Sequence, residues 1–231
     1  MENNCGEKKE NSNRGEDDKN SYCGEREENI FENKYVHTFY EDKSREFDVT
    51  RQRHWPKTLE FLETYNRPEY IVLDDGCGNG RCILDRNIIG LDYSMGLLQQ
   101  ARNKRSNELV RGDAMKLPFY SNSFDLVLSI AVIHHMSTYE RRVEALKEIH
   151  RVLKPSGKCL IYVWDEATKH KSKFIPIQDK DYFVTWNKNK EIKRYYYLFD
   201  LNELKTFCGA CGFKIIDSGK EQESLFVILE K

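Results

Sequence analysis

The chain of 231 residues is long enough for one domain with a full-sized hydrophobic core, and its formal net charge is −1. No stretch approaches the roughly 18 consecutive apolar residues of a membrane-spanning helix, and the polar N-terminus lacks the apolar core of a secretory signal. Seven scattered cysteines, an odd number, favour free thiols over a disulfide framework. These features argue against a membrane partner and predict a protein of the cytoplasm, or of the cytoplasm and the nucleus.

Charge is distributed unevenly along the chain. Residues 1–29 contain nine acidic residues and five Lys or Arg, a net charge of −4, and almost no apolar side chains. We predict that this acidic tail is disordered, because it cannot bury enough apolar surface to offset the entropy lost on ordering. One folded domain is then expected over residues 30–231, with 29 acidic and 32 basic residues. Its net charge of +3 permits a nucleic-acid partner without requiring one.

The first two thirds of this domain alternate between helical and strand patterns. Helices are expected over residues 30–39 and 56–65, the second with Pro56 in its first turn. Short apolar runs predict strands at residues 70–74, 87–92, 109–112 and 123–130, the third of them short enough for a sheet edge. A helix over 138–152, a turn at 155–157 and a strand over 158–164 follow. This rhythm predicts a doubly wound, Rossmann-like α/β fold with a parallel sheet.

The C-terminal third of the domain has a different residue pattern. Residues 165–194 are polar and aromatic without a clear period, so we expect a long loop, a kind of segment that is often functional. A helix over 201–211 should stop at Gly212, and strands are expected at 213–217 and 225–230. The short link between these strands favours an antiparallel hairpin. The expected sheet is therefore seven-stranded and mostly parallel, with an antiparallel hairpin at its C-terminal end.

A glycine-rich turn follows the first predicted strand, in residues 73–80 (LDDGCGNG). Its three glycines allow a tight turn and a close approach of the backbone to a ligand. A dinucleotide-binding fingerprint needs a further glycine where this chain has Arg81, so a pyrophosphate ligand is disfavoured. With Asp74 ahead of it, the turn suits a cofactor whose amino-acid tail offers an ammonium group to a carboxylate. It therefore predicts S-adenosylmethionine; the alternative is an ordinary strand-to-helix loop.

Polar residues also follow the next three predicted strands. Asp92 ends the second strand and can accept hydrogen bonds from both hydroxyls of a ribose, while Asp113 follows the third and can face an adenine edge. Each residue alone is also explained as a helix cap or a turn residue, but open α/β sheets bind ligands at the carboxyl ends of their strands. We therefore predict one cofactor site formed by Asp74, Gly76, Gly78, Asn79, Gly80, Asp92, Tyr93, Asp113, Ala114, Ser129 and Ile130.

Histidines and cysteines offer weaker signals. His134 and His135 follow the fourth predicted strand without a third ligand at suitable spacing, so no metal is expected. His134 is the better candidate for contact with a substrate, and a structural role is the alternative for both. The single C-x-x-C pair, Cys208 and Cys211, lies on an apolar helix face and favours buried thiols over zinc. The basic segment 169–173 (KHKSK) is either a solvated loop or a phosphate contact.

Several stretches resemble one particular family. They are residues 50–56 (TRQRHWP), 129–142 (SIAVIHHMSTYERR), 160–164 (LIYVW), 181–186 (DYFVTW) and 194–199 (RYYYLF). Together they resemble the eukaryotic tRNA wobble-uridine carboxymethyl methyltransferases, a family of class I S-adenosylmethionine-dependent enzymes, over roughly residues 30–231. The resemblance implies that the chain methylates the carboxylate of 5-carboxymethyluridine in the tRNA anticodon loop. It also implies a heterodimer with a small zinc-binding activator protein at the edge strand near Leu109–Gly112.

A carboxylate acceptor would simplify the chemistry that this resemblance implies. A carboxylic acid with a pKa of about 4 is ionised at neutral pH, so no general base is required. Guanidinium groups recognise such an anion, and Arg51 and Arg194 are favoured over Arg141 and Arg142 because each lies beside aromatic residues. We expect Arg51, His134 and Arg194 to form the catalytic set. Four aromatic residues either stack on the acceptor base or pack in the core: Trp55, Trp186, Tyr195 and Tyr196.

Two other functions remain open from the sequence. A methyltransferase acting on a small molecule would make the basic segment and the arginines incidental. A non-catalytic subunit that binds the cofactor and only supports a partner is disfavoured by the intact glycine turn with Asp74 and Asp92.

Overall fold

The computed structural model describes residues 27–50, 54–186 and 189–231, without the side chains of 189 and 190. The predicted tail therefore lies outside the described residues up to position 26. Residues 27–32 are helical, so the domain boundary expected after residue 29 lies within a helix. This helix continues as the π-helical turn η1 (Asn33–His37), α2 (Thr38–Asp42) and α3 (Ser44–Thr50).

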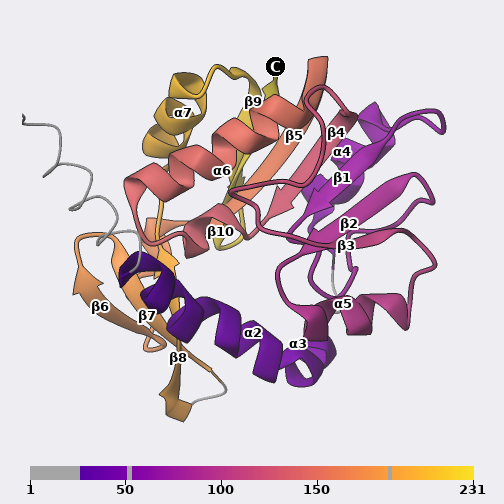
Figure 1. The fold of residues 1–231 in the computed structure, drawn as a ribbon. Coiled ribbons are helices and arrows are strands. Elements are labelled where there is room, and N and C mark those ends of the chain that lie inside the picture. The colour runs from indigo at the N-terminus through magenta and orange to yellow at the C-terminus, as the bar shows by residue number, and fades with distance from the viewer. Residues whose placement is uncertain (1–26, 51–53, 187–188) are drawn as a thin grey trace, which may run out of the picture.

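A seven-stranded sheet forms the centre of the molecule (Figure 1). Its order is β3-β2-β1-β4-β5-β10-β9, where the first five strands in sequence are parallel and β10 runs antiparallel to both of its neighbours. This topology confirms the predicted Rossmann-like fold with its C-terminal hairpin and places β3 at an edge. The strands are β1 (Val72–Asp75), β2 (Ile88–Asp92), β3 (Leu109–Arg111), β4 (Phe124–Ile130), β5 (Leu153–Trp164), β9 (Lys214–Glu221) and β10 (Ser224–Glu230).

Helices cover both faces of this sheet. One core lies under α6 (Tyr139–Val152) and α7 (Leu201–Ala210), and the other under α4 (Pro56–Tyr65) and α5 (Met95–Arg102), a helix that the sequence did not single out. In α6 the fully buried residues Ala145, Leu146, Ile149 and Val152 recur at helical spacing, which explains why this segment is a helix packed on the sheet. Its start is fixed by the Thr138 side chain, which accepts a hydrogen bond from the Arg141 backbone.

The prediction of a long loop over residues 165–194 is wrong. After a short 3₁₀ turn, η3 (Glu166–Thr168), the chain forms a separate antiparallel sheet of β6 (Phe174–Gln178), β7 (Asp181–Trp186) and β8 (Asn189–Tyr197). In β7 the buried residues Tyr182, Val184 and Trp186 alternate with half-buried ones, which is the period of a strand. The alternation is hidden in the sequence because Phe183, on the other face, is also aromatic and packs against Tyr35, with 4.6 Å between ring centroids.

The prediction that a turn at residues 155–157 precedes the fifth strand is also wrong. The strand β5 begins at Leu153 and continues through this segment, so it is longer than the strand predicted over 158–164. Ser156 has a φ of 64°, and the pairing of β5 with β4 shifts register between Phe124 and Leu126. The turn residues therefore form an irregularity inside the strand rather than its start.

The N-terminal helical segment, residues 27–50, crosses the molecule between α5 and the small sheet (Figure 1). Polar contacts attach it at two places. The Glu32 carboxylate accepts a hydrogen bond from the Ser137 backbone at 2.6 Å, and that of Glu41 accepts one from the Ser94 hydroxyl at 2.7 Å. The segment thereby covers the carboxyl ends of the central strands. In the described part of the chain, no helix is long and apolar enough to cross a membrane.

Candidate active site

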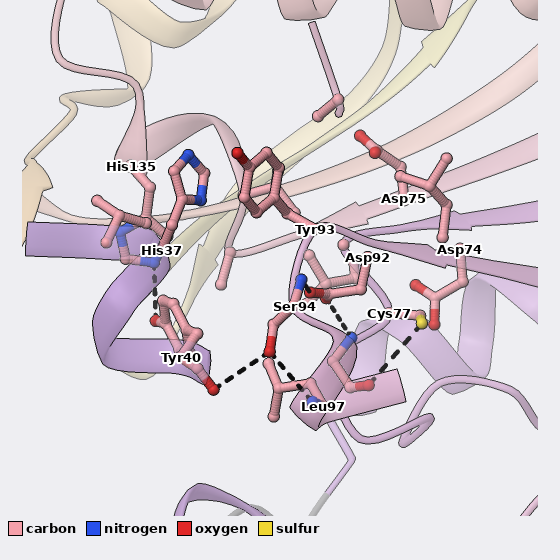
Figure 2. A pocket seen from close by; sticks show the side chains of 18 of the residues that line it. His37, Tyr40, Asp74, Asp75, Cys77, Asp92, Tyr93, Ser94, Leu97 and His135 are labelled. Atoms are coloured by element: carbon pink, nitrogen blue, oxygen red, sulfur yellow. Dashed lines mark hydrogen bonds between the residues drawn. The ribbon is translucent and has the colours of Figure 1, made fainter. Parts of the chain in front are cut away.

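A pocket lies between the carboxyl ends of the central strands and the N-terminal helical segment, and it encloses about 1220 Å³ including its open mouth (Figure 2). Four residues at helical spacing, Glu32, Val36, His37 and Tyr40, turn one face of the segment towards it. The His37 ring stacks on that of Tyr93 with 3.8 Å between centroids. Nine of the predicted cofactor residues line the pocket: Asp74, Gly76, Gly78, Asn79, Asp92, Tyr93, Asp113, Ala114 and Ile130.

The glycine turn forms the floor of this pocket. All three of its glycines have positive φ values, between 56° and 73°, which favour glycine over other residues. A Cβ atom added to Gly78 would meet nothing closer than Phe47 at 4.0 Å, so this glycine keeps open space for a ligand. A Cβ atom added to Gly80 would instead lie 3.1 Å from Ala101 of α5. Gly80 therefore allows close packing of the turn on α5, and it does not line the pocket.

Asp92 joins the turn to the start of α5. One of its carboxylate oxygens accepts a hydrogen bond from the Gly78 backbone at 2.8 Å, and the other accepts one from the Ser94 backbone at 2.9 Å (Figure 2). Burial raises its pKa to about 6, although these hydrogen bonds act in the opposite direction. Since a carboxylate oxygen accepts more than one hydrogen bond, both oxygens keep the capacity to accept from a ligand hydroxyl.

Two further buried carboxyl groups have incomplete hydrogen bonding. Burial raises the pKa of Asp74 to about 7 and that of Asp75 to about 8, and neighbouring carboxyl groups add to both shifts. Among the described residues, neither Asp74 Oδ2 nor Asp75 Oδ1 has a hydrogen-bond partner. The Ser129 hydroxyl lies 3.3 Å from the other Asp75 oxygen and donates to it, so Ser129 holds Asp75 and does not line the pocket. The buried Asp74 oxygen without a donor indicates a ligand that brings one, whereas Asp75, with a pKa of about 8, holds its own proton at neutral pH.

The structure places His135, rather than His134, on the pocket. The two residues belong to the short 3₁₀ helix η2 (Ile133–His135), in which successive side chains point about 120° apart. His134 is buried beside the pocket, where its Nδ1 accepts a hydrogen bond from the Trp164 backbone at 3.2 Å. His135 contacts the Tyr195 carbonyl oxygen through Nδ1 and the Tyr40 hydroxyl through Nε2, both at 2.9 Å. Burial lowers its pKa to about 3, so its ring is neutral at pH 7.

Arg194 is the one predicted catalytic residue that lines the pocket in the described part of the chain. Its side chain is 3% exposed, and its guanidinium lies 4.8 Å from the ring centroids of both Phe39 and Trp186 and 5.2 Å from that of Tyr196. Within the described residues it forms no ion pair, and its Nε has no hydrogen-bond partner. A buried cation held by aromatic faces without a carboxylate is suited to bind an anionic ligand.

The other predicted arginines have structural partners. Arg141 forms an ion pair with Glu32 at 2.7 Å. Arg142 donates a hydrogen bond to the Met136 carbonyl oxygen at 2.8 Å and lies over the Tyr197 ring. Arg51 lies outside the described residues.

The remaining sequence signals belong mostly to packing and to surface ion pairs. Trp55 lines the pocket under the guanidinium of Arg81, Trp186 packs on Phe39, and Tyr195 is buried. The basic segment is paired with acids, Lys169 with Glu166, and both Lys171 and Lys173 with Glu223. Cys208 and Cys211 are buried free thiols, and no metal-binding group of three or more His, Cys, Asp or Glu occurs in the described ranges.

Comparison with known proteins identifies the family. The family model described as "Methyltransferase domain" matches residues 73–161. A candidate methyltransferase of Encephalitozoon cuniculi (strain GB-M1) is 52% identical over 204 residues, which cover 87% of this chain and 97% of that protein. The tRNA (carboxymethyluridine(34)-5-O)-methyltransferase of Schizosaccharomyces pombe is 33% identical over 226 residues, which cover 87% of this chain and 98% of that protein. The chain belongs to the tRNA carboxymethyluridine methyltransferase family of class I S-adenosylmethionine-dependent methyltransferases.

A solved structure shares the fold of this methyltransferase. A chain of the complex between the Haloferax volcanii Trm112 methyltransferase activator and its candidate methyltransferase matches with a TM-score of 0.66 and 19% sequence identity. The match covers 83% of this chain and 96% of that chain.

The pocket of the methyltransferase fits S-adenosylmethionine, the cofactor of its family. The ammonium group of the cofactor would supply the donor that Asp74 lacks, and its ribose hydroxyls would donate to Asp92. The open space above Gly78 admits the ligand without a clash. Asp113 and Ala114 line the part of the pocket next to β3, where the adenine would lie.

Many pocket residues of the methyltransferase were not predicted as site residues, among them Tyr40, Asp75, Arg81 and Trp164. A signal was present for Asp75, since an acidic residue near the end of a buried apolar strand is unusual. No local signal existed for Tyr40 and Trp164, because only the fold brings them to the strand ends.

Replacement of Asp75 by asparagine is expected to stabilise the cofactor-free methyltransferase at alkaline pH. Between its unfolded pKa near 3.8 and its folded pKa of about 8, Asp75 binds more protons in the folded state, so its contribution to the free energy of unfolding falls as pH rises. Asparagine stays neutral and still accepts from Ser129. We expect a gain of a few kcal/mol at pH 8 and little change at pH 4, measured by urea unfolding. Parallel pH dependences of the two proteins would contradict the burial of an ionising Asp75.

Proposed function

We propose that this methyltransferase transfers the methyl group of S-adenosylmethionine to the carboxylate of 5-carboxymethyluridine at the wobble position of tRNA, giving the methyl ester. The observation that supports this acceptor is the buried guanidinium of Arg194, which lines the pocket without an acidic partner among the described residues. The Schizosaccharomyces pombe relative carries this activity in its name. The bound cofactor supplies an electrophilic methyl group on a sulfonium.

We call the part of the pocket around Arg194 its acceptor end. The residues there fit a reaction without a general base. A carboxylate with a pKa of about 4 is already ionised at pH 7. His135, with its pKa lowered to about 3, is neutral; its Nδ1 contacts the Tyr195 carbonyl oxygen and its Nε2 contacts the Tyr40 hydroxyl. Both ring nitrogens therefore have partners within the protein, and we assign His135 no proton transfer with the acceptor. The work of the chain is then orientation of one carboxylate oxygen, which contributes roughly 7–11 kcal/mol in favourable cases.

The same end of the pocket offers stacking surfaces for a base. Trp164 and Tyr196 both line the pocket, and their rings are stacked with 4.5 Å between centroids and 17° between planes. Proteins that recognise single-stranded RNA stack unpaired bases on such aromatic side chains. An anion site beside a stacked aromatic pair suits a nucleobase that carries a carboxylate.

A methylation assay on tRNA bearing 5-carboxymethyluridine, with and without the activator protein, tests this function. The expected result is a methyl ester on that tRNA, and none on tRNA that lacks the carboxymethyl group or on small carboxylic acids. Methylation of small acids alone would favour the small-molecule enzyme. Failure to bind S-adenosylmethionine, even with the activator present, would favour the non-catalytic subunit.

We further propose that a small zinc-binding activator protein pairs with the edge strand β3. This strand is only half-buried, and the complex named above shows that a protein of this fold assembles with a Trm112 activator. In the ladder with β2, Gly90 donates to the Glu108 carbonyl oxygen and Gly112 donates to that of Asp92. Because alternate residues bond to each neighbour of a parallel strand, the Arg111 backbone N–H points away from β2.

Replacement of Arg111 by proline is expected to weaken activator binding at least tenfold, since proline removes this outward N–H and is tolerated at a sheet edge. Arg111→Ala keeps the N–H and serves as the matched control. Calorimetry with the purified activator measures both, with cofactor affinity as the check on folding. Equal activator binding by Arg111→Pro and the unchanged protein would place the partner elsewhere.

A further inference from the structure

Tyr40 contributes a hydroxyl group at the acceptor end of the pocket, from a segment outside the matched residues 73–161. The hydroxyl lies 2.9 Å from His135 Nε2, 3.4 Å from the Tyr196 hydroxyl and 3.5 Å from Arg194 Nη1. Its ring packs edge-on against those of Phe39 and His135. Figure 2 shows Tyr40 and His135 together, away from Asp74 and Asp75.

The direction of each hydrogen bond in this group follows from the chemistry of its members. The Tyr195 carbonyl oxygen only accepts, so His135 Nδ1, at 2.9 Å, must carry the proton. Burial is the largest influence on the pKa of His135 and lowers it, as do Arg194 and His37. The hydrogen bond to the Tyr195 carbonyl oxygen raises this pKa, but the net shift is downward and disfavours a second proton on the ring. His135 Nε2 is therefore an acceptor, and the Tyr40 hydroxyl donates its single proton to it.

A hydroxyl that has donated its proton can only accept from its other neighbours. Tyr40 therefore turns its oxygen lone pairs towards Arg194 Nη1. The other close neighbours of this guanidinium are the aromatic faces of Phe39, Trp186 and Tyr196, which attract its charge but do not fix its rotation. Among the described residues, the Tyr40 hydroxyl is the hydrogen-bond acceptor that Arg194 contacts, and the Tyr196 hydroxyl lies 3.4 Å from the Tyr40 hydroxyl.

We propose that Tyr40 is a positioning residue: its hydroxyl donates its proton to His135, accepts from Arg194, and thereby orients the Arg194 guanidinium towards the carboxylate of the acceptor. The inference rests on the proposed function, since it assigns Arg194 to an acceptor carboxylate. It also gives the N-terminal helical segment a role in turnover, because the positioning group comes from that segment. Tyr40 itself has no proton left to donate to the acceptor, so the donors to the carboxylate belong to Arg194.

The test is a double-mutant cycle between Tyr40→Phe and Arg194→Ala, assayed on carboxymethylated tRNA. Phenylalanine keeps the ring packing and removes only the hydroxyl. We expect Tyr40→Phe to lower kcat/KM on this tRNA about tenfold and to leave the Kd for S-adenosylmethionine within twofold of the unchanged protein. In the Arg194→Ala background the same substitution should cost almost nothing, because Tyr40 acts through Arg194.

Tyr35→Phe is the matched control, since Tyr35 lies half-buried on the same segment and makes only ring contacts among the described interactions. It should retain full activity. His135→Ala, which removes the acceptor of the Tyr40 proton, should cause a similar loss and should not add to that of Tyr40→Phe.

Full activity of Tyr40→Phe, or losses that add to those of Arg194→Ala, would overturn the positioning role. These outcomes differ from failure of the proposed function, in which the unchanged protein itself would not methylate carboxymethylated tRNA. If Tyr40→Phe loses cofactor affinity through misfolding, the His135→Ala and Arg194→Ala pair gives the same cycle, and additivity there would overturn the proposal.

Discussion

Replacement of Asp74 by alanine is expected to abolish measurable binding of S-adenosylmethionine. The carboxyl group of Asp74 is fully buried, lines the pocket, and has one oxygen without a donor among the described residues. Burial raises its pKa to about 7, which shows how poorly this site stabilises the negative charge before a cation arrives. The ammonium of the cofactor would therefore gain a strong charge-assisted partner, and alanine removes it.

Isothermal titration calorimetry with S-adenosylmethionine measures this effect directly. We expect the Kd to rise by a hundredfold or more, on the order of 3 kcal/mol, which is typical for loss of a buried hydrogen-bonded charge pair. Asp217→Ala, an exposed aspartate on β9, is the control and should bind normally. Unchanged affinity of Asp74→Ala would show that the cofactor site is assigned to the wrong residues.

Replacement of Arg194 by alanine should leave cofactor affinity intact and lower kcat/KM on carboxymethylated tRNA by about 10–100-fold. The magnitude follows from the net loss of one hydrogen bond to a charged acceptor, worth roughly 1.5–3 kcal/mol. Arg194→Lys keeps the charge and loses the planar fork, so an intermediate activity is expected. Aromatic faces at 4.8 Å position the guanidinium but do not replace it as a donor.

Single-turnover methylation with saturating cofactor measures the loss, and calorimetry with S-adenosylmethionine verifies that the cofactor still binds. Arg67→Ala is a suitable control, because Arg67 is exposed and its guanidinium donates to the carbonyl oxygens of Thr64, at the end of α4, and of Asn66. A parallel fall in cofactor affinity would assign Arg194 to the cofactor end of the pocket instead of the acceptor end.

The fold of this chain could be predicted from its sequence to a large extent. Strand-length apolar runs and well-capped helices specify the parallel sheet, as in α6 with Thr138 at its start. The failure at residues 165–194 has a physical cause. The small sheet β6–β7–β8 is covered on both faces by aromatic residues, so the contrast between buried and exposed positions that marks a strand is weak there.

The sequence by itself predicted most of the residues that line the proposed cofactor end of the pocket. The glycine turn and Asp92 follow neighbouring parallel strands, and the geometry of such a sheet brings their carboxyl ends together without further information. Two predicted cofactor residues do not line the pocket. Gly80 allows the turn to pack against α5, and Ser129 donates a hydrogen bond to Asp75.

Only the tertiary structure decided the acceptor end. Tyr40, His135 and Arg194 are separated by 95 and 59 positions in the chain, and no local spacing connects a residue of the N-terminal segment with one of β8. The choice between His134 and His135 depended on the turn of a single 3₁₀ helix. The glycine turn thus predicts the part of the pocket that we assign to the methyl donor, whereas the proposed anion site around Arg194 is formed only when the N-terminal segment and the small sheet pack over the strand ends.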